Sequence, residues 1–456
     1  MRREVLNIDS LNRVHFIGIG GIGMSALAKF FLFRNIEVSG YDKVCSSITK
    51  SLSKDGANII YEDDLSLIKS KDEIDLVVYT PAIPSDNRQL DYFSSSRIPF
   101  HKRAYILGQI TKSYHTIAVA GTHGKTTTSS IIAHILQYNK LGGVSFLGGI
   151  STNYNSNILL QDGNNAVVEA DEYDRSFLKL FPNMILLTSM DPDHLDIYGD
   201  NQSLIEGFKL FTALLENKNK LIVQEDLNSH FNDCLTYGFH KNSSLSIQHI
   251  RIQKGGYFFD VLYNDKLYSD FEFYLPGKYN LLNAAGAILC GFEMGLDAQQ
   301  IKSGLASFSG VKRRFEVHYD KNDIVYIDDY AHHPKEITAL VNGLRDFYPK
   351  HKIIGVFQPH LYSRTRDFMH GFQEALSLLD QLFLMPIYPA REKPIKDVSS
   401  ENLLIDIALE SKSVLNNEDD LFLSLKQENK FVLVTIGAGD IDLLINPIKT
   451  FLHENF

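Results

Sequence analysis

Residues 116–128 read Thr-Ile-Ala-Val-Ala-Gly-Thr-His-Gly-Lys-Thr-Thr-Thr, which predicts a strand, a glycine turn and a helix in that order. The apolar run at 117–120 is typical of a buried parallel strand. The two glycines of the turn allow backbone N–H groups to converge on phosphate oxygens, and the helix N-terminus adds its positive dipole end. Lys125 is placed to reach the β and γ oxygens of a nucleotide, and Thr126 to offer a hydroxyl to Mg²⁺. The stretch therefore predicts an ATP site in an α/β domain.

An alternative interpretation of this stretch is a glycine turn followed by an exposed lysine. The alternative is disfavoured because Gly-Lys-Thr directly after an apolar strand is uncommon by chance. The residues of the turn expected to contact ATP are Gly121, Thr122, His123, Gly124, Lys125, Thr126 and Thr127.

Length and composition limit the class of protein. The chain has 456 residues, which suggests about three domains of roughly 150 residues each. Hydrophobic residues make up 44% and charged residues 22%, and these globular values exclude a disordered or fibrous chain. The formal net charge of -10 disfavours a nucleic-acid partner held by its phosphates. We therefore expect small anions as ligands.

The cysteines and the N-terminus favour a cytoplasmic protein. Cys45, Cys234 and Cys290 have neither metal-finger spacing nor the pattern of a disulfide framework. The first ten residues carry acids where a signal peptide needs an apolar core. The longest uncharged stretch, 141–161, is broken by Gly, Ser and Asn, so we expect no membrane span and interpret it as a loop-rich segment facing the substrate.

A second glycine turn lies at Gly18–Gly23, between a strand-like run and a helical one. Asp42 follows it by 19 residues, where an acidic side chain usually accepts hydrogen bonds from ribose hydroxyls. A dinucleotide or nucleotide-sugar site is indicated, with an NAD domain and a purely structural turn as alternatives. Two prolines after the strand at 75–80 place another loop at the same sheet edge. The residues predicted to bind the nucleotide sugar are Gly18, Gly20, Gly21, Ile22, Gly23, Met24, Asp42, Thr80 and Ala82.

Acidic side chains follow two further apolar strands. Ala166–Val168 leads into Glu169, and Met184–Leu187 leads into a segment that contains His194. Carboxylates and an imidazole at neighbouring strand ends, beside a phosphate loop, suit a cation that bridges nucleotide phosphates. A cation site is therefore predicted at these strand ends, and solvated acidic loops are the alternative.

Residues 255–274 alternate aromatic and polar side chains and predict hairpin strands. An alanine-rich helix with two asparagines at its start follows. Asn283 therefore either caps this helix or contacts the nucleotide.

The last third of the chain predicts another open, mostly parallel sheet. Strand signals at 324–327, 352–357, 381–385 and 431–436 alternate with helical stretches. Three histidines, His332, His333 and His360, follow the first two strands, and a cluster at one sheet edge favours a site over isolated core histidines.

Taken in order, these motifs resemble those of one family, the Mur ligases, over nearly the whole chain. The matching segments are Gly18–Ser25, Gly121–Thr128, Glu169–Glu172, Asp193–Asp196, Val311–Phe315, Asp328–Pro334 and Phe357–His360. The resemblance implies three α/β domains: an N-terminal Rossmann-like UDP-binding domain (1–112), a central P-loop ATPase domain with a mostly parallel sheet (113–312) and a C-terminal Rossmann-like domain (313–456).

By the same resemblance, the chain uses ATP and Mg²⁺ to form an amide through an acyl phosphate, with UDP-N-acetylmuramate and L-alanine as substrates and a monomer or homodimer as the assembly. Arg314 resembles a phosphate-contacting arginine, Asn283 an ATP-contacting asparagine and Asp329 an acid near the ribose. His332, His360 and Arg364 resemble groups around the reacting carboxylate and the amino acid. The ligands implied are Thr126 and Glu169 for one Mg²⁺ and His194 for a second. The catalytic set implied is Lys125, His194, Arg314, His332, His360 and Arg364.

Some positions depart from the family pattern. Tyr279 stands where a His-Asn pair is commoner, Leu361 where arginine is common, Tyr173 where serine is usual and Ser189–Asp191 where Asn-Ile-Glu is frequent. Lys209 is a candidate for the carbamylated lysine of sister enzymes, although we expect it to be an unmodified surface residue.

Three other functions compete with the L-alanine ligase. A related ligase reattaches a recycled tripeptide to the same UDP sugar, but Gly20–Met24 favours the L-alanine branch. An NAD-dependent oxidoreductase leaves Lys125, Glu169 and His194 without a role. A nucleotide-gated binding protein explains both glycine turns but predicts no product.

Overall fold

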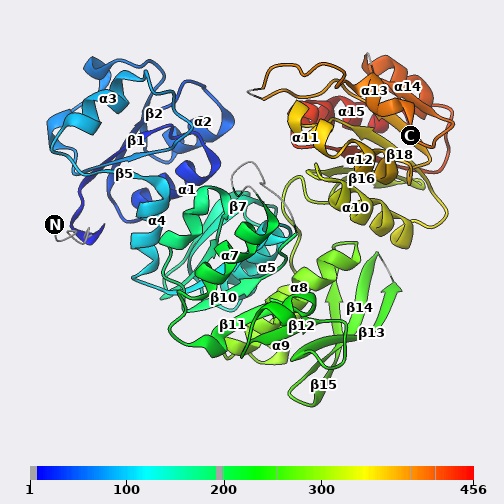
Figure 1. The fold of residues 1–456 in the computed structure, drawn as a ribbon, viewed down its shortest axis with the longest axis horizontal. Coiled ribbons are helices and arrows are strands. Elements are labelled where there is room, and N and C mark those ends of the chain that lie inside the picture. The colour runs from blue at the N-terminus through cyan, green and yellow to red at the C-terminus, as the bar shows by residue number, and fades with distance from the viewer. Residues whose placement is uncertain (1–7, 192–197, 199, 254, 391, 416) are drawn as a thin grey trace. The chain divides into compact units, whose positions relative to one another are not determined.

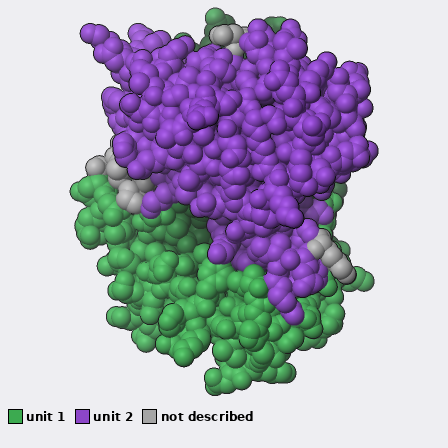
Figure 2. Space-filling model, turned by 90° about the vertical axis from the view of Figure 1, so that its right-hand side faces the viewer, with its two compact units in different colours: residues 1–250, 259–272, 282–308 green, residues 251–258, 273–281, 309–456 purple. Residues whose placement is uncertain are grey.

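The computed structural model describes residues 8–191, 198, 200–253, 255–390, 392–415 and 417–456. Close packing divides the chain into two compact units (Figure 2). One unit comprises residues 1–250, 259–272 and 282–308, and the other comprises 251–258, 273–281 and 309–456. Three sheets with their helices follow one another along the chain (Figure 1).

The first sheet is parallel throughout and has the strand order β3-β2-β1-β4-β5. From β1 the chain runs outward to β3 and then crosses back to β4 on the other side of β1, and the turn at 18–21 lies at the carboxyl end of β1, where the strand order reverses. Ligands gather at such positions in open α/β sheets. The elements are β1 (Arg13–Ile17), α1 (Ile22–Phe33), β2 (Glu37–Tyr41), α2 (Ser47–Lys54), β3 (Asn58–Ile60), β4 (Leu76–Tyr79), α3 (Arg88–Ser95), β5 (Phe100–Lys102) and α4 (Arg103–Thr111).

The second sheet has ten strands in the order β15-β14-β13-β12-β11-β10-β6-β9-β7-β8. Its central strands β10, β6 and β9 are parallel and buried, as the apolar runs predict. The elements are β6 (His115–Ala120), α5 (Lys125–Tyr138), β7 (Gly143–Ser151), β8 (Ser156–Leu160), β9 (Asn165–Glu169), β10 (Met184–Leu187), α7 (Asn201–Thr212), β11 (Leu221–Gln224), β12 (Leu235–Gly238), β13 (Leu245–Gln253), β14 (Gly256–Tyr263), β15 (Lys266–Phe273), α8 (Lys278–Glu293) and α9 (Ala298–Ala306).

The third sheet has the order β16-β17-β21-β18-β19-β20 and is parallel except for the edge strand β16. The predicted α/β class with mostly parallel sheets is therefore confirmed. The elements are β16 (Glu316–Lys321), β17 (Ile324–Asp329), α10 (Pro334–Phe347), β18 (Lys352–Phe357), α11 (Tyr362–Asp367), α12 (Met369–Leu376), β19 (Gln381–Leu384), α13 (Ser400–Ile405), β20 (Lys412–Val414), α14 (Glu418–Leu425), β21 (Phe431–Ile436) and α15 (Ile445–Asn455).

The prediction of a loop-rich segment at 141–161 is wrong. Strands β7 and β8 form an antiparallel hairpin there, and β7 also pairs with β9 in parallel. Phe146 and Ile158 are buried and pack in the same core as Phe30 of α1. Burial of such side chains stabilises the hairpin by on the order of 2 kcal/mol each, which outweighs the weak strand propensity of the glycines.

Candidate functional site

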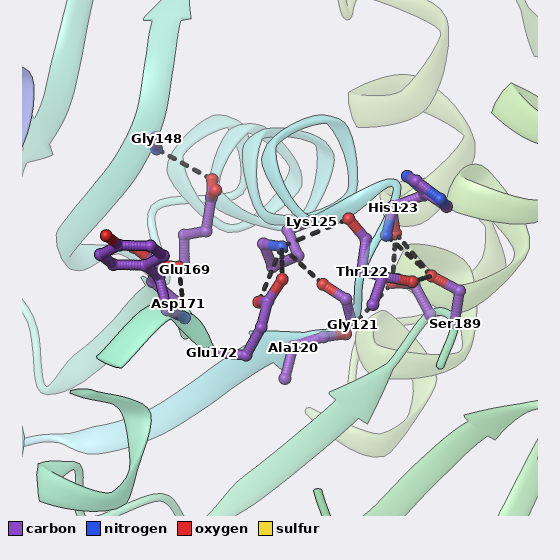
Figure 3. Close-up of polar contacts among 12 residues, drawn as sticks. Ala120, Gly121, Thr122, His123, Lys125, Gly148, Glu169, Asp171, Glu172 and Ser189 are labelled. Carbon is purple, nitrogen blue, oxygen red and sulfur yellow. Dashed lines mark hydrogen bonds and ion pairs between the residues drawn. The ribbon is translucent and has the colours of Figure 1, made fainter. Parts of the chain in front are cut away.

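The loop between β6 and α5 is held from the end of β10. The backbone N–H groups of Thr122 and His123 donate to the backbone oxygen and the hydroxyl of Ser189, at 3.2 and 2.8 Å. Gly121 has φ 133° and lies so close to Thr188 that a Cβ atom would be 2.2 Å from its hydroxyl oxygen. Only glycine fits this position, so β10 fixes the shape of the loop (Figure 3).

The N-terminus of α5 has no side-chain cap. Its N-cap residue Gly124 has φ 80°, and a Cβ atom there would lie 2.5 Å from the Asn283 side-chain oxygen. The first N–H groups of a helix lack partners within the helix. This turn is therefore suited to receive an anion, and the Asn283 amide lies beside it rather than at a helix cap.

Lys125 lies among acids in the loop. Its Nζ donates to the Gly121 carbonyl at 2.6 Å and forms an ion pair with the buried Glu172 at 2.8 Å (Figure 3). Burial alone would lower the pKa of Lys125, but the charges of Glu172, Glu169 and Asp171 raise it above its usual value. The lysine is therefore held as a cation at the mouth of the phosphate loop.

Glu169 lies at the end of β9 and faces the same loop. Its carboxylate accepts hydrogen bonds from the Thr126 hydroxyl and the Gly148 N–H, both at 3.0 Å. Burial raises the pKa of Glu169, despite the opposing effect of Lys125. A hydroxyl and a carboxylate oxygen at this separation are hard ligands of the kind that Mg²⁺ prefers, and a cation would offset the cost of burying this charge.

The structure describes only some of the predicted Mg²⁺ ligands. Thr126 and Glu169 lie together, whereas His194 lies outside the described residues. Among the residues that the structure describes, no group of three or more His, Cys, Asp or Glu side chains is arranged to hold a metal. The structure therefore brings two of the three predicted ligands together, and their role towards a metal stays a prediction.

The first glycine turn is fixed by an acid. Asp42 accepts hydrogen bonds from the backbone N–H groups of Gly20 and Val44, at 2.7 and 3.0 Å. Gly18 has φ 86°, and a Cβ atom on it would lie 2.7 Å from the Thr80 methyl carbon. Asp42 therefore orders the turn, in addition to its predicted role towards a ribose.

A cavity of about 340 Å³ extends from the first glycine turn to Glu169 at the end of β9. One wall is the start of α1 at 21–24, where no side chain caps the helix, together with Thr80. The rest of the lining includes Gly148 of β7, Glu169 of β9 and Asp171, which follows β9. A ligand bound at the first turn would thus extend to the carboxylates beside the phosphate loop.

Arg314 and Asp329 lie together in the other unit. Asp329 accepts hydrogen bonds from the backbone N–H groups of Phe315 and Ala331, both at 2.8 Å. Burial raises the pKa of Asp329 to about 6, although the Arg314 charge opposes this. The Arg314 guanidinium lies 5.1 Å from the centre of the Tyr330 ring, a cation–π distance. These contacts hold the two side chains at the carboxyl end of β17.

His332, His360 and Arg364 form a second group in this unit. The rings of His332 and His360 are 6.4 Å apart, and Arg364 Nη1 lies 3.5 Å from His360 Nδ1. Burial lowers the pKa of His360 to about 4, and the charges of His332 and Arg364 act in the same direction. His333 instead caps α10 in a reciprocal pair with Glu336, so it has a structural role.

Comparison with known proteins decides the family. Three Mur ligase profiles match: the "Mur ligase family, catalytic domain" over residues 13–115, the "Mur ligase middle domain" over 119–291 and the "Mur ligase, glutamate ligase domain" over 313–439. The UDP-N-acetylmuramate–L-alanine ligase of Flavobacterium johnsoniae is 44% identical, over 99% of this chain and 100% of its own. The chain belongs to the Mur ligase family.

Other Mur ligases agree over the same length. The UDP-N-acetylmuramate–L-alanine ligase of Cytophaga hutchinsonii is 43% identical over 99% of both chains. The crystal structure of the UDP-N-acetylmuramate-alanine ligase from Thermotoga maritima superposes with a TM-score of 0.82 at 27% identity, covering 97% of this chain and 99% of that one. The three-part α/β architecture expected of a Mur ligase is thus confirmed.

The positions that depart from the Mur ligase pattern have different surroundings in the structure. Ser189 supplies the hydroxyl that holds the phosphate loop. Tyr279 is largely buried near Asp329 and Arg314, and burial raises its pKa well above the usual value. Leu361 has a positive φ of 72°, which is unusual for a side chain of its size.

Glu172 and Arg103 are the site residues that sequence reasoning missed. Glu172 is the ion-pair partner of Lys125, and Arg103 lines the cavity at the start of α4. Glu172 stands in a recognised acidic segment, but only the folded chain shows which acid faces the lysine. The signal for Arg103 was its place directly after the strand at 100–102, at the sheet edge that carries the first turn.

Proposed function

We propose that this Mur ligase joins L-alanine to the lactyl carboxylate of UDP-N-acetylmuramate in the cytoplasm, with conversion of ATP to ADP and phosphate. The observation that carries the proposal is the cavity that extends from the first glycine turn to Glu169, whose carboxylate accepts a hydrogen bond from Thr126 at the phosphate loop. A UDP sugar whose diphosphate lies at the N-terminus of α1 would direct its far end to Glu169 and the phosphate loop. Relatives that are 42–46% identical are named for this reaction.

ATP is assigned to the loop at 121–127. Its phosphates would accept hydrogen bonds from the uncapped N–H groups of α5, and Lys125 would exchange its contact with Gly121 for phosphate oxygens. Thr126 and Glu169 would hold Mg²⁺, which neutralises charge on the transferred phosphoryl group. His194 remains a proposed ligand for a second ion. Asn283 lies beside the loop at Gly124 and is proposed to contact the nucleotide.

The proposed reaction has two steps. A lactyl carboxylate oxygen attacks the γ-phosphorus and the bond to the β-phosphate oxygen breaks, which gives an acyl phosphate and ADP. The neutral amine of L-alanine then attacks the acyl carbon, phosphate leaves and the amine loses a proton. Lys125 and Arg314 would stabilise the phosphoryl charge, which is where fixed cations contribute most.

The amino-acid side is assigned to His332, His360 and Arg364. The low pKa of His360 leaves its imidazole neutral near pH 7, so Arg364 is the fixed cation of this group for a carboxylate. Asp329 is proposed to face the ribose of ATP. The tripeptide-adding reaction is the alternative substrate choice, and the names of the relatives favour L-alanine over it.

The proposal is tested by omission of each substrate in turn. Purified protein is given ATP, Mg²⁺, UDP-N-acetylmuramate and L-alanine, and then mixtures that lack one component. We expect ADP, phosphate and the alanyl UDP sugar only in the complete mixture, because the acyl phosphate must be captured by the amine. Equal phosphate release without the UDP sugar, or turnover with the tripeptide but not with L-alanine, would contradict it.

A further inference from the structure

The segment 359–363 leaves β18 in a strained conformation. Leu361 has φ 72° and ψ 135°, and it stands at the N-cap of α11 without a side-chain hydrogen bond to the helix. A side chain of this kind at positive φ costs on the order of 1–3 kcal/mol and persists only where neighbours enforce it. His360, which precedes it, and Arg364, three residues after it, belong to the group assigned to the amino acid.

Tyr388 supplies the enforcing contacts. The Leu361 N–H donates to the Tyr388 carbonyl at 2.9 Å, and the Tyr388 N–H donates to the Pro359 carbonyl at 2.8 Å. The ring of Tyr388 stacks on His360 at 5.6 Å and 15°. The His360 imidazole is therefore held on one face by the Tyr388 ring.

Glu392 completes the contact at the start of α11. Its carboxylate accepts a hydrogen bond from the Ser363 N–H at 2.9 Å and a short one from the Ser363 hydroxyl. It thus gives the helix the cap that Leu361 does not provide. Burial would raise the pKa of Glu392, but the hydrogen bonds from Ser363 and Tyr362 and the Arg364 charge lower it.

We propose that Glu392 is a positioning residue for the amino-acid substrate: it fixes the first turn of α11 and thereby the direction of Arg364 and His360. The proposal rests on the function proposed above, since it assigns the amino acid to this group. Glu392 does not contact the substrate in this account, because Ser363 occupies both of its carboxylate oxygens. Its removal should therefore alter the use of one substrate out of three.

The test compares Glu392→Ala, Glu392→Gln and the wild-type enzyme. We expect Glu392→Ala to raise the KM for L-alanine about tenfold, the effect of one hydrogen bond to a charged group, with less than about twofold change in the KM for ATP and the UDP sugar. Glu392→Gln should recover most of the loss, because its amide oxygen still accepts from the Ser363 N–H. The matched control is Glu374→Ala on α12, whose carboxylate is 71% exposed and pairs only with His370 in the contacts described.

Hydrogen exchange gives a readout that needs no substrate. The Ser363 amide should exchange at least about tenfold faster in Glu392→Ala than in wild type, since it loses its acceptor. An unchanged KM for L-alanine, equal rises in all three KM values or unchanged exchange would each overturn the proposal. If the wild-type enzyme consumes a different amine, the assignment of L-alanine fails, and the same comparison made with that amine still decides the role of Glu392.

Discussion

The two glycine turns of this protein share a backbone plan but differ in charge. Each follows a parallel strand, contains at least one glycine at positive φ and opens a helix without a side-chain cap. The first turn is tied to an acid, because Asp42 accepts from the Gly20 N–H. The second carries Lys125, which is held by Glu172. The backbone therefore suits both turns to anions, and we propose that the side chains decide which one stabilises a charge that develops during reaction.

Among the variants proposed, removal of the Lys125 side chain should have the largest effect on activity. Lys125→Ala is expected to lower kcat/KM by about 10²–10³-fold, as for other groups that stabilise a developing charge. Binding of the UDP sugar should change little, since its proposed diphosphate site is the other turn. Steady-state kinetics and a UDP-sugar titration measure both quantities. An equal loss of affinity for ATP and for the UDP sugar would mean that the two turns do not bind separate nucleotides.

A buried histidine lies in an element next to each turn, and the two histidines predict that the fold becomes less stable in acid. His15 in β1 and His134 in α5 each have a pKa lowered to about 4, chiefly by burial, against 6.5 for the free side chain. Between pH 6.5 and 4 the unfolded chain binds more protons than the folded one, so stability falls as the pH falls. Each group contributes at most about 3 kcal/mol to that loss.

The measurement is the thermal unfolding midpoint between pH 7 and 4.5 for wild type and for His134→Gln. The variant is expected to be less stable at pH 7 but to lose less stability on acidification. His370→Gln on the exposed face of α12 is the control, and it should follow wild type, because its side chain is 83% exposed. A wild-type slope retained in His134→Gln would exclude His134 as a source of the acid sensitivity.

Removal of the Asp42 carboxylate, which orders the first turn, should weaken binding of the UDP sugar. Asp42→Ala is expected to weaken UDP-sugar binding about tenfold to a hundredfold and to leave ATP binding nearly unchanged. Part of the loss would come from the freed Gly20 N–H, so Asp42→Asn should lose less. Calorimetric titration of both ligands checks this, with the exposed Asp55→Ala as control. Weaker ATP with an intact UDP-sugar affinity would refute the assignment.

The smallest effect is expected at Lys209. It lies on the exposed side of α7, and we predict that it is unmodified. Lys209→Ala should keep activity within about twofold of wild type, as is usual for surface substitutions, and it serves as the matched lysine control for Lys125→Ala. A large loss that short-chain carboxylic acids restore would show instead that a carbamate at Lys209 holds a metal.

Local chemistry explains what the sequence could predict. The apolar run before Gly121 and the lysine after Gly124 define a strand, a turn and a helix within a few residues, and β6 and α5 are where this pattern indicates. The strands at 184–187, 352–357 and 431–436 were also predicted at their observed bounds, because their apolar runs are continuous.

Contacts between distant segments explain what the sequence could not predict. The hairpin of β7 and β8 is stabilised by α1 and β9, and its glycines conceal it in a local pattern. The pairing of Lys125 with Glu172 rather than Glu169, and the capping role of His333 beside the site residue His332, depend on side-chain directions. Sequence alone cannot separate such neighbours.

The most direct measurement follows the oxygen atoms of the sugar carboxylate. UDP-N-acetylmuramate labelled with ¹⁸O in its lactyl carboxylate is converted with ATP and L-alanine, and the released phosphate is analysed by mass spectrometry. If the ligand at the first turn attacks the nucleotide at the second, each phosphate formed carries one ¹⁸O atom from the sugar. Phosphate without ¹⁸O, formed together with the alanyl product, would contradict the account.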